Sequence, residues 1–128
     1  MLLFTYGTLR PSLYPDVVRR LRVKPVGSAT LDAGQFAMHD LGPFPALVPD
    51  ADGPAIVGEL VEVDTLDRFD RYEGYEPGGG GLYDRRLVAA VADPREPPVR
   101  AWVYFMKALP REAPKVASGD WSTVVGDL

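Results

Sequence analysis

The sequence contains no cysteine and a single histidine, His39. The lack of cysteine excludes disulfide bonds, thiolate metal ligands and a cysteine nucleophile. A Ser-His-Asp triad would have to include His39, and a histidine-based zinc site would need carboxylates as its remaining ligands. Both kinds of site are therefore disfavoured, and few kinds of side-chain chemistry remain.

Long apolar runs and an excess of positive charge are also lacking. The N-terminal stretch has no basic region and only four apolar residues before Thr5, which is too few for a signal peptide, and no run approaches the ~18 apolar residues of a membrane span. Lys and Arg number 14 against 18 Asp and Glu, so the net charge of -4 repels nucleic-acid phosphates and anionic lipids. We expect a soluble, cytoplasmic protein with neither a nucleic-acid nor a membrane partner.

The composition that is present suits one small domain rich in turns. Hydrophobic residues make up 46% of the 128 residues, enough for a buried core, and we treat residues 1–128 as one domain. Gly and Pro, at 13 each, indicate many turns and short strands. Roughly residues 109–128, rich in Ala, Pro and Ser, are expected to form an irregular tail.

Glycine and proline divide the rest of the chain into short apolar stretches. Those that predict strands are Leu2–Thr5, Val26–Leu31, Gln35–His39, Ala46–Pro49, Ile56–Val63, Tyr83–Val91 and Val99–Phe105. Two short helices are predicted. One runs from Pro15 to about Arg22, with its start marked by Ser12 and Pro15, and the other lies over 65–73 and is capped by Asp64 and Thr65. The paucity of helix disfavours a doubly wound α/β fold. We predict an α+β domain, a small mixed, mostly antiparallel β-barrel with short flanking helices.

The helix over 65–73 carries the best candidate for proton transfer. Leu66, Phe69 and Glu73 recur at i, i+3 and i+7, so they share one face and place Glu73 on the apolar side. Gly74 follows as a C-cap glycine would, which puts Glu73 in the last turn. The negative end of the helix dipole and a desolvating wall both favour a neutral carboxyl, so we expect the pKa of Glu73 to be raised. The alternative is that Glu73 merely begins an exposed acidic turn.

Two other titratable residues compete with Glu73. Glu59 shares the apolar face of its predicted strand, where an ion pair with an arginine such as Arg85 would be structural, and we favour that interpretation. His39 follows Phe36 and Met38 at the edge of a loop, a position more typical of a structural or exposed histidine than of a catalyst.

Two glycine-containing loops are candidates for binding. Tyr6, Gly7, Thr8 and Leu9 follow the first strand, and a glycine turn there allows backbone N–H groups to converge on an anion; the alternative is an ordinary strand-ending turn. The run 78–81 is all glycine but lacks the Gly-Lys-Ser/Thr of a phosphate-binding loop, so it is interpreted as a flexible loop and a possible lid.

These residues fall into a pattern of short motifs. In chain order they are Y-G-T-L-R at 6–10, G-E-L at 58–60, F-D-R-Y-E-G at 69–74, Y-D-R at 83–85 and S-G-D-W at 118–121. Together they resemble the gamma-glutamylcyclotransferase-like, or AIG2-like, family over nearly the whole chain. The combination of Y-G-T-L near the N-terminus with a later D-x-x-E-G is the more specific part of the resemblance.

The resemblance implies a small mixed β-barrel and an activity. In characterised relatives the α-amine of a small γ-glutamyl compound attacks its own γ-carbonyl, which leaves 5-oxoproline and releases an amino acid or amine. The general acid/base of the family falls on Glu73, and the loop that contacts the glutamyl moiety falls on Tyr6, Gly7, Thr8 and Leu9. Tyr83, Arg85 and Tyr104 are taken as pocket or barrel scaffolding. No metal or other cofactor is implied.

Two further functions stay open at this stage. One is a non-catalytic module that uses the same cavity to bind a small metabolite or a partner protein, and the other is hydrolysis of a different amide by water activated at Glu73. The sequence does not identify the physiological substrate, the oligomeric state, the roles of Glu59 and the glycine run, or what Asp120 and Trp121 cover.

Overall fold

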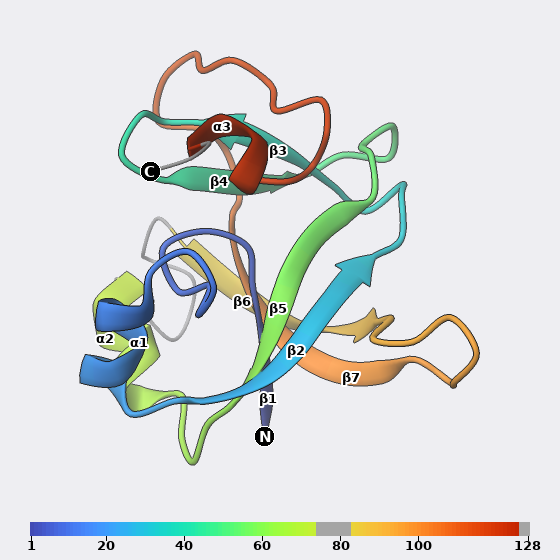
Figure 1. The fold of residues 1–128 in the computed structure, drawn as a ribbon. Coiled ribbons are helices and arrows are strands. Elements are labelled where there is room, and N and C mark those ends of the chain that lie inside the picture. The colour runs from blue at the N-terminus through green and yellow to red at the C-terminus, as the bar shows by residue number, and fades with distance from the viewer. Residues whose placement is uncertain (74–82, 126–128) are drawn as a thin grey trace.

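The structure is a computed structural model that describes residues 1–73 and 83–125. Within these ranges the strands are β1 (Leu2–Thr5), β2 (Lys24–Leu31), β3 (Phe36–Asp40), β4 (Pro45–Pro49), β5 (Ile56–Glu62), β6 (Tyr83–Ala90) and β7 (Val99–Met106). The helices are α1 (Pro15–Leu21), α2 (Asp67–Glu73) and α3 (Ser122–Val125) (Figure 1). Every predicted strand is present, and no strand end differs from its prediction by more than two residues.

Five strands form one mixed sheet in the order β2-β5-β1-β7-β6. The short strand β1 lies at its centre, antiparallel to β5 and parallel to β7, where Leu3 lies opposite Trp102. The other neighbouring pairs are antiparallel. Strands β3 and β4 pair with each other in a second sheet, and His39 of β3 also forms an isolated antiparallel bridge with Lys115. The prediction of an α+β fold with a mixed, mostly antiparallel sheet and few helices is confirmed.

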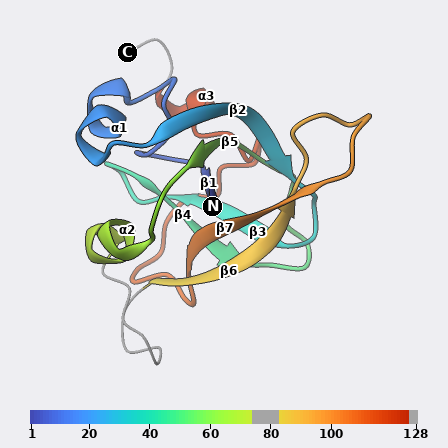
Figure 2. The same cartoon turned by 90° about the horizontal axis from the view of Figure 1, so that it is seen from below.

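The predicted closed barrel is wrong for the described part of the chain. Seen from below (Figure 2), the sheet curls strongly, but its edge strands β2 and β6 meet at one end only, where the backbones of Thr30 and Val91 exchange hydrogen bonds of 3.0 and 2.8 Å. The reason lies in β2, whose register shifts between Pro25 and Gly27 and whose first five residues are exposed. A bulge of this kind bends a strand and ends regular pairing at its edge.

The core is divided into two clusters by β1, because successive side chains of a strand point to opposite faces. Phe4 belongs to one cluster, together with Phe36 of β3 and Trp121, and Leu3 belongs to the other, together with Phe69 of α2. All of these side chains are almost completely buried. The chain that follows β1 therefore begins at the boundary between the two clusters.

Helix α1 begins at Pro15, as predicted, whereas α2 begins two residues later than predicted. Pro15 occupies the first turn of α1, but Ser12 does not cap the helix, since its backbone N–H and its hydroxyl both donate to Glu59. Helix α2 begins at Asp67, whose N–H donates to the Thr65 hydroxyl at 3.2 Å. A side-chain oxygen at this position satisfies one of the free N–H groups of a helix start.

The C-terminal segment, predicted to be irregular, is mostly non-repetitive chain with the single short helix α3 in its described part. Trp121 is 1% exposed, and its indole N–H donates to the Tyr14 hydroxyl at 2.9 Å. The C-terminal segment thus covers the core cluster that contains Phe4. Among the described helices, none has the length and apolar character needed to cross a membrane.

Candidate active site

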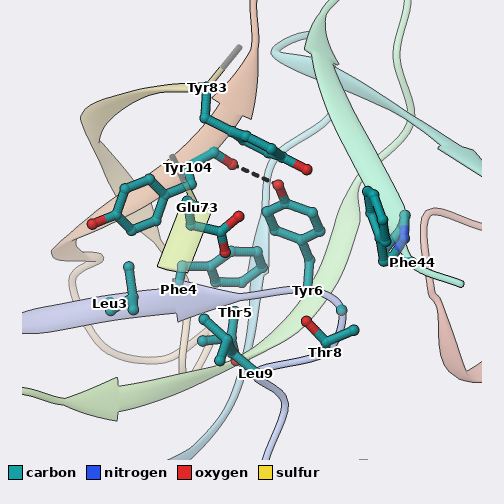
Figure 3. Close-up of a pocket in the computed structure, with 12 residues that line it drawn as sticks. Leu3, Phe4, Thr5, Tyr6, Thr8, Leu9, Phe44, Glu73, Tyr83 and Tyr104 are labelled. Atoms are coloured by element: carbon teal, nitrogen blue, oxygen red, sulfur yellow. Dashed lines mark hydrogen bonds between the residues drawn. The ribbon is translucent and has the colours of Figure 1, made fainter. Parts of the chain in front are cut away.

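A pocket of about 220 Å³ lies at the end of β1. It is enclosed by the chain after β1, the turn between β3 and β4, the last turn of α2, and strands β6 and β7 (Figure 3). The described lining consists of Leu3, Phe4, Thr5, Tyr6, Gly7, Thr8, Leu9, Phe44, Pro45, Glu73, Tyr83 and Tyr104. The structure therefore brings together all five predicted site residues, although Glu73 lies more than sixty positions after the loop at 6–9 in the sequence.

The loop at 6–9 forms one wall of this pocket. The carbonyl of Gly7 accepts a hydrogen bond of 3.0 Å from the backbone N–H of Arg10, which closes a turn. A Cβ atom at Gly7 would lie 2.7 Å from the Cγ and Cδ atoms of Pro45, closer than side chains normally pack. Glycine at this position thus allows the loop to lie directly against the first residue of β4.

Glu73 reaches the pocket because of the helical spacing of α2. Leu66, the residue directly before α2, and Phe69 within it are buried on the same side, and that side carries Glu73 to the pocket wall. Its carboxyl points inward, between the rings of Tyr6 and Tyr104 (Figure 3). Burial raises the pKa of Glu73 to about 7. A carboxyl with this pKa is both an acceptor and a donor of protons near neutral pH.

Three tyrosines surround this carboxyl. The Tyr6 hydroxyl donates to the backbone carbonyl of Tyr104 at 2.6 Å, which ties the loop after β1 to β7. Burial, followed by the nearby Glu73 and Tyr83, raises the pKa of Tyr6 well above its ordinary value, and burial also raises the pKa of Tyr104. Both phenols stay neutral at physiological pH. Tyr83 and Tyr104, predicted as pocket or barrel scaffolding, line the pocket.

Glu59 lies outside the described lining and is held by other residues. Its Oε2 accepts from Arg10 Nε at 2.8 Å and from the Ser12 hydroxyl at 2.7 Å, and its Oε1 accepts from the Ser12 N–H at 3.1 Å. The predicted pairing with Arg85 is wrong, because Arg85 Nε lies 3.1 Å from Oδ1 of Asp70 instead. These contacts favour the structural interpretation of Glu59.

Arg10 also reaches the C-terminal segment, a link that the sequence analysis missed. Its Nη1 donates to Oδ1 of Asp120 at 2.8 Å. Arg10, Glu59 and Asp120 belong to three separate motifs, Y-G-T-L-R, G-E-L and S-G-D-W. Arg10, Glu59 and Asp120 are each the single charged residue of their motif, and one cation with two anions was a signal for this network.

His39 takes part in neither the pocket nor this network. It is 8% exposed, and its Nδ1 lies 3.0 Å from the backbone carbonyl of Ala113. In the described ranges, no group of three or more His, Asp or Glu side chains is arranged to hold a metal ion. Gly74 and the glycine run at 78–81 lie outside the described residues.

The fold and the pocket define a class of protein: a small α+β domain in which a buried carboxyl of raised pKa shares a pocket with a glycine turn. The family model described as gamma-glutamyl cyclotransferase, AIG2-like, matches residues 3–123, and the chain belongs to this family. The resemblance found in the sequence is thereby confirmed. No curated protein matches the chain.

Solved structures show the same fold. An AIG2-like protein from Mus musculus has a TM-score of 0.69 and 23% identity, over 85% of this chain and 79% of that one. A protein specific to uropathogenic E. coli has a TM-score of 0.71 and 18% identity, over 99% and 96%. A gamma-glutamyl cyclotransferase has a TM-score of 0.63 and 14% identity, over 90% and 69%. At these identities the likeness is one of fold.

Proposed function

We propose that this protein is a gamma-glutamyl cyclotransferase-type enzyme, which converts a small γ-glutamyl compound into 5-oxoproline and an amino acid or amine. The observation that carries the proposal is that the carboxyl of Glu73, with a pKa of about 7, shares one pocket with the turn at 6–9. Membership of a family that is described by this activity supports it.

The proposed reaction needs proton transfer and little else. The α-amine nitrogen of the substrate attacks its own γ-carbonyl carbon; a C–N bond forms to close the lactam ring, and the original amide C–N bond breaks. The substrate ammonium loses two protons in becoming the lactam N–H. One passes to solvent before the attack, and the Glu73 carboxylate takes the other as the ring closes and returns it to the leaving nitrogen, so that the carboxylate is regenerated. The released amine then takes up a proton from solvent. Because the attack is intramolecular, binding the folded-back substrate supplies much of the rate enhancement.

Each wall of the pocket has a role in this proposal. The turn formed by Tyr6, Gly7, Thr8 and Leu9 offers backbone N–H groups to an anionic part of the substrate, either its α-carboxylate or the oxyanion that develops on the γ-carbonyl. The apolar wall keeps Glu73 desolvated. A volume of about 220 Å³ is below the roughly 300–1,000 Å³ that is typical for drug-sized ligands, which favours a substrate of metabolite size.

The decisive experiment is an assay for 5-oxoproline. The protein is incubated with a panel of γ-glutamyl amino acids, γ-glutamyl amines and a γ-glutamyl-lysine isopeptide, and products are separated by chromatography and identified by mass. We expect 5-oxoproline from at least one of them. Glu73→Gln keeps the shape of the side chain but not its basicity, so kcat should fall by about 10²-fold or more. Glu62→Gln, the same change at an exposed residue of β5, is the matched control.

Other outcomes identify the competing functions. Free glutamate in place of 5-oxoproline would mean hydrolysis by activated water. Ligand-dependent thermal stabilisation without turnover would mean a binding module. An undiminished rate in Glu73→Gln would remove Glu73 from the reaction.

A further inference from the structure

Asp70 joins helix α2 to the large sheet. Its Oδ1 accepts a hydrogen bond of 2.6 Å from the hydroxyl of Tyr104, and the same oxygen lies 3.1 Å from Nε of Arg85. The side chains of Asp70 and Arg85 are only 19% and 22% exposed. A charge-assisted contact that is shielded from water to this degree is stronger than a surface ion pair.

Helix α2 depends on contacts of this kind for its orientation. It has seven residues, too few to be stable without tertiary packing. Leu66 and Phe69 bury one face of it in the core. Asp70 lies one residue beyond Phe69 and three before Glu73, so Asp70 and Glu73 are neighbours along the helix surface. A contact at Asp70 therefore fixes the last turn, from which Glu73 projects.

The partners of Asp70 are themselves part of a rigid arrangement. Arg85 and Tyr104 lie directly opposite each other in the register of β6 and β7, and the guanidinium of Arg85 stacks on the Trp102 ring at 4.7 Å from its centroid. Tyr104 also accepts, through its backbone carbonyl, the hydrogen bond from Tyr6. Tyr104 of β7 thus contacts α2 through its side chain. It contacts the pocket loop through its backbone, as the dashed line in Figure 3 shows.

We propose that Asp70 is a positioning residue for Glu73, holding the last turn of α2 against Tyr104 and Arg85 so that the Glu73 carboxyl stays inside the pocket. The kinetic consequence of this inference rests on the proposed function, whereas its structural consequence does not. Asp70 is absent from the described pocket lining, so it acts through Glu73 and not on a substrate.

Loss of the contact should change the environment of Glu73. The other titratable residues of the described pocket lining are Tyr6, Tyr83 and Tyr104, and burial keeps the phenols of Tyr6 and Tyr104 neutral near pH 7. Burial is therefore the main influence on its carboxyl. If the last turn of α2 is released, the carboxyl gains access to water and its pKa falls toward the ordinary value for glutamate.

The structural test is a titration of Glu73 followed by NMR. The carboxyl carbons of glutamate are labelled with ¹³C, and the Glu73 signal is assigned as the one missing from Glu73→Gln. We expect the apparent pKa to fall by about one unit or more in Asp70→Ala and in Tyr104→Phe, which keeps the ring in the pocket wall. Asp67→Ala, at an exposed position of the same helix, should titrate like the wild type. An unchanged titration in folded Tyr104→Phe would overturn the proposal.

The kinetic test applies once the wild type releases 5-oxoproline. In Asp70→Ala and Tyr104→Phe, kcat should fall about tenfold or more while KM stays within about threefold, because substrate contacts remain but the base is displaced. The acidic limb of the pH profile should move to lower pH, and Asp70→Glu should restore part of the rate. A lower melting temperature with unchanged kcat and pH profile would show that Asp70 only stabilises the fold. If the wild type is inert on every substrate, the proposed function fails, and the titration still decides the role of Asp70.

Discussion

Arg10 donates its Nε hydrogen to Oε2 of Glu59 at 2.8 Å, in an interior where the two side chains are 8% and 11% exposed. The same guanidinium holds Asp120. Although burial alone would raise the pKa of Asp120, hydrogen bonds from Ser122 and Arg10 lower it, so this carboxylate stays charged. Because Arg10 directly follows the pocket loop at 6–9, the ion pair anchors one end of that loop to β5 and to the C-terminal segment.

Arg10→Ala should therefore be strongly destabilising. The substitution leaves the buried Glu59 without its cation, and such a loss costs about 3 kcal/mol or more in free energy of unfolding. Urea denaturation measures the change. Arg95→Ala, which removes an arginine that is 88% exposed and paired with Asp93, is the control and should cost less than about 0.5 kcal/mol. Similar losses in the two variants would contradict a structural role for the buried pair.

The strands were predictable because their signal is local. The stretch Leu2–Thr5 is apolar and ends before a glycine turn, and β6 and β7 alternate around the turn at 93–98, so each strand could be placed within two residues. Their arrangement was not predictable in the same way. The parallel pairing of Leu3 with Trp102 joins residues almost a hundred positions apart, and the shift between Pro25 and Gly27 that leaves the sheet open depends on pairing with β5.

The candidate site was also predictable only in part: the local spacing placed Glu73, but it did not identify the ion-pair partners. The spacing of Leu66, Phe69 and Glu73 identifies the apolar face of α2 from the sequence alone, and the structure places Glu73 in the pocket. The choice of partners was not predictable from spacing. From the sequence alone, Glu59 could pair with any of several arginines. The fold brings Arg10 to Glu59 and Arg85 to Asp70.

The raised pKa of Glu73 predicts a dependence of stability on pH. Its value of about 7 lies above the ordinary value for an unfolded glutamate, so folding favours the protonated form. The resulting stabilisation is complete below about pH 4 and is lost as the pH rises through 7. Glu73→Gln cannot ionise, so its stability relative to wild type should increase by about 2 kcal/mol between pH 5 and pH 8.

Urea denaturation of both proteins at the two pH values provides this comparison. Glu62→Gln at an exposed position should show no such change relative to wild type. A constant difference between Glu73→Gln and wild type across the range would mean that Glu73 is solvated in the folded protein.

The same pKa predicts the pH dependence of the proposed reaction. The base form of Glu73 predominates only above about pH 7, so kcat/KM for 5-oxoproline release should decline as the pH falls below 7. Initial rates measured from pH 5 to pH 9 at low substrate concentration give this limb. If the limb instead lies near pH 4, the group that titrates is an ordinary exposed carboxyl.

The contact between Gly7 and Pro45 predicts coupling between the two walls of the pocket. A methyl group at Gly7 would lie 2.7 Å from Pro45, so Gly7→Ala must push the loop at 6–9 away from β4. We expect a loss of about 1–3 kcal/mol in stability from this overpacking, and a higher KM because the displaced turn binds the substrate less well.

Pro45→Ala removes the atoms that a methyl group at Gly7 would contact, so the double variant should recover part of both losses. Urea denaturation of the two single variants and the double variant forms a double-mutant cycle, in which a coupling of about 1 kcal/mol is expected. Strictly additive effects on stability and KM would show that the contact between Gly7 and Pro45 does not couple the two walls of the pocket.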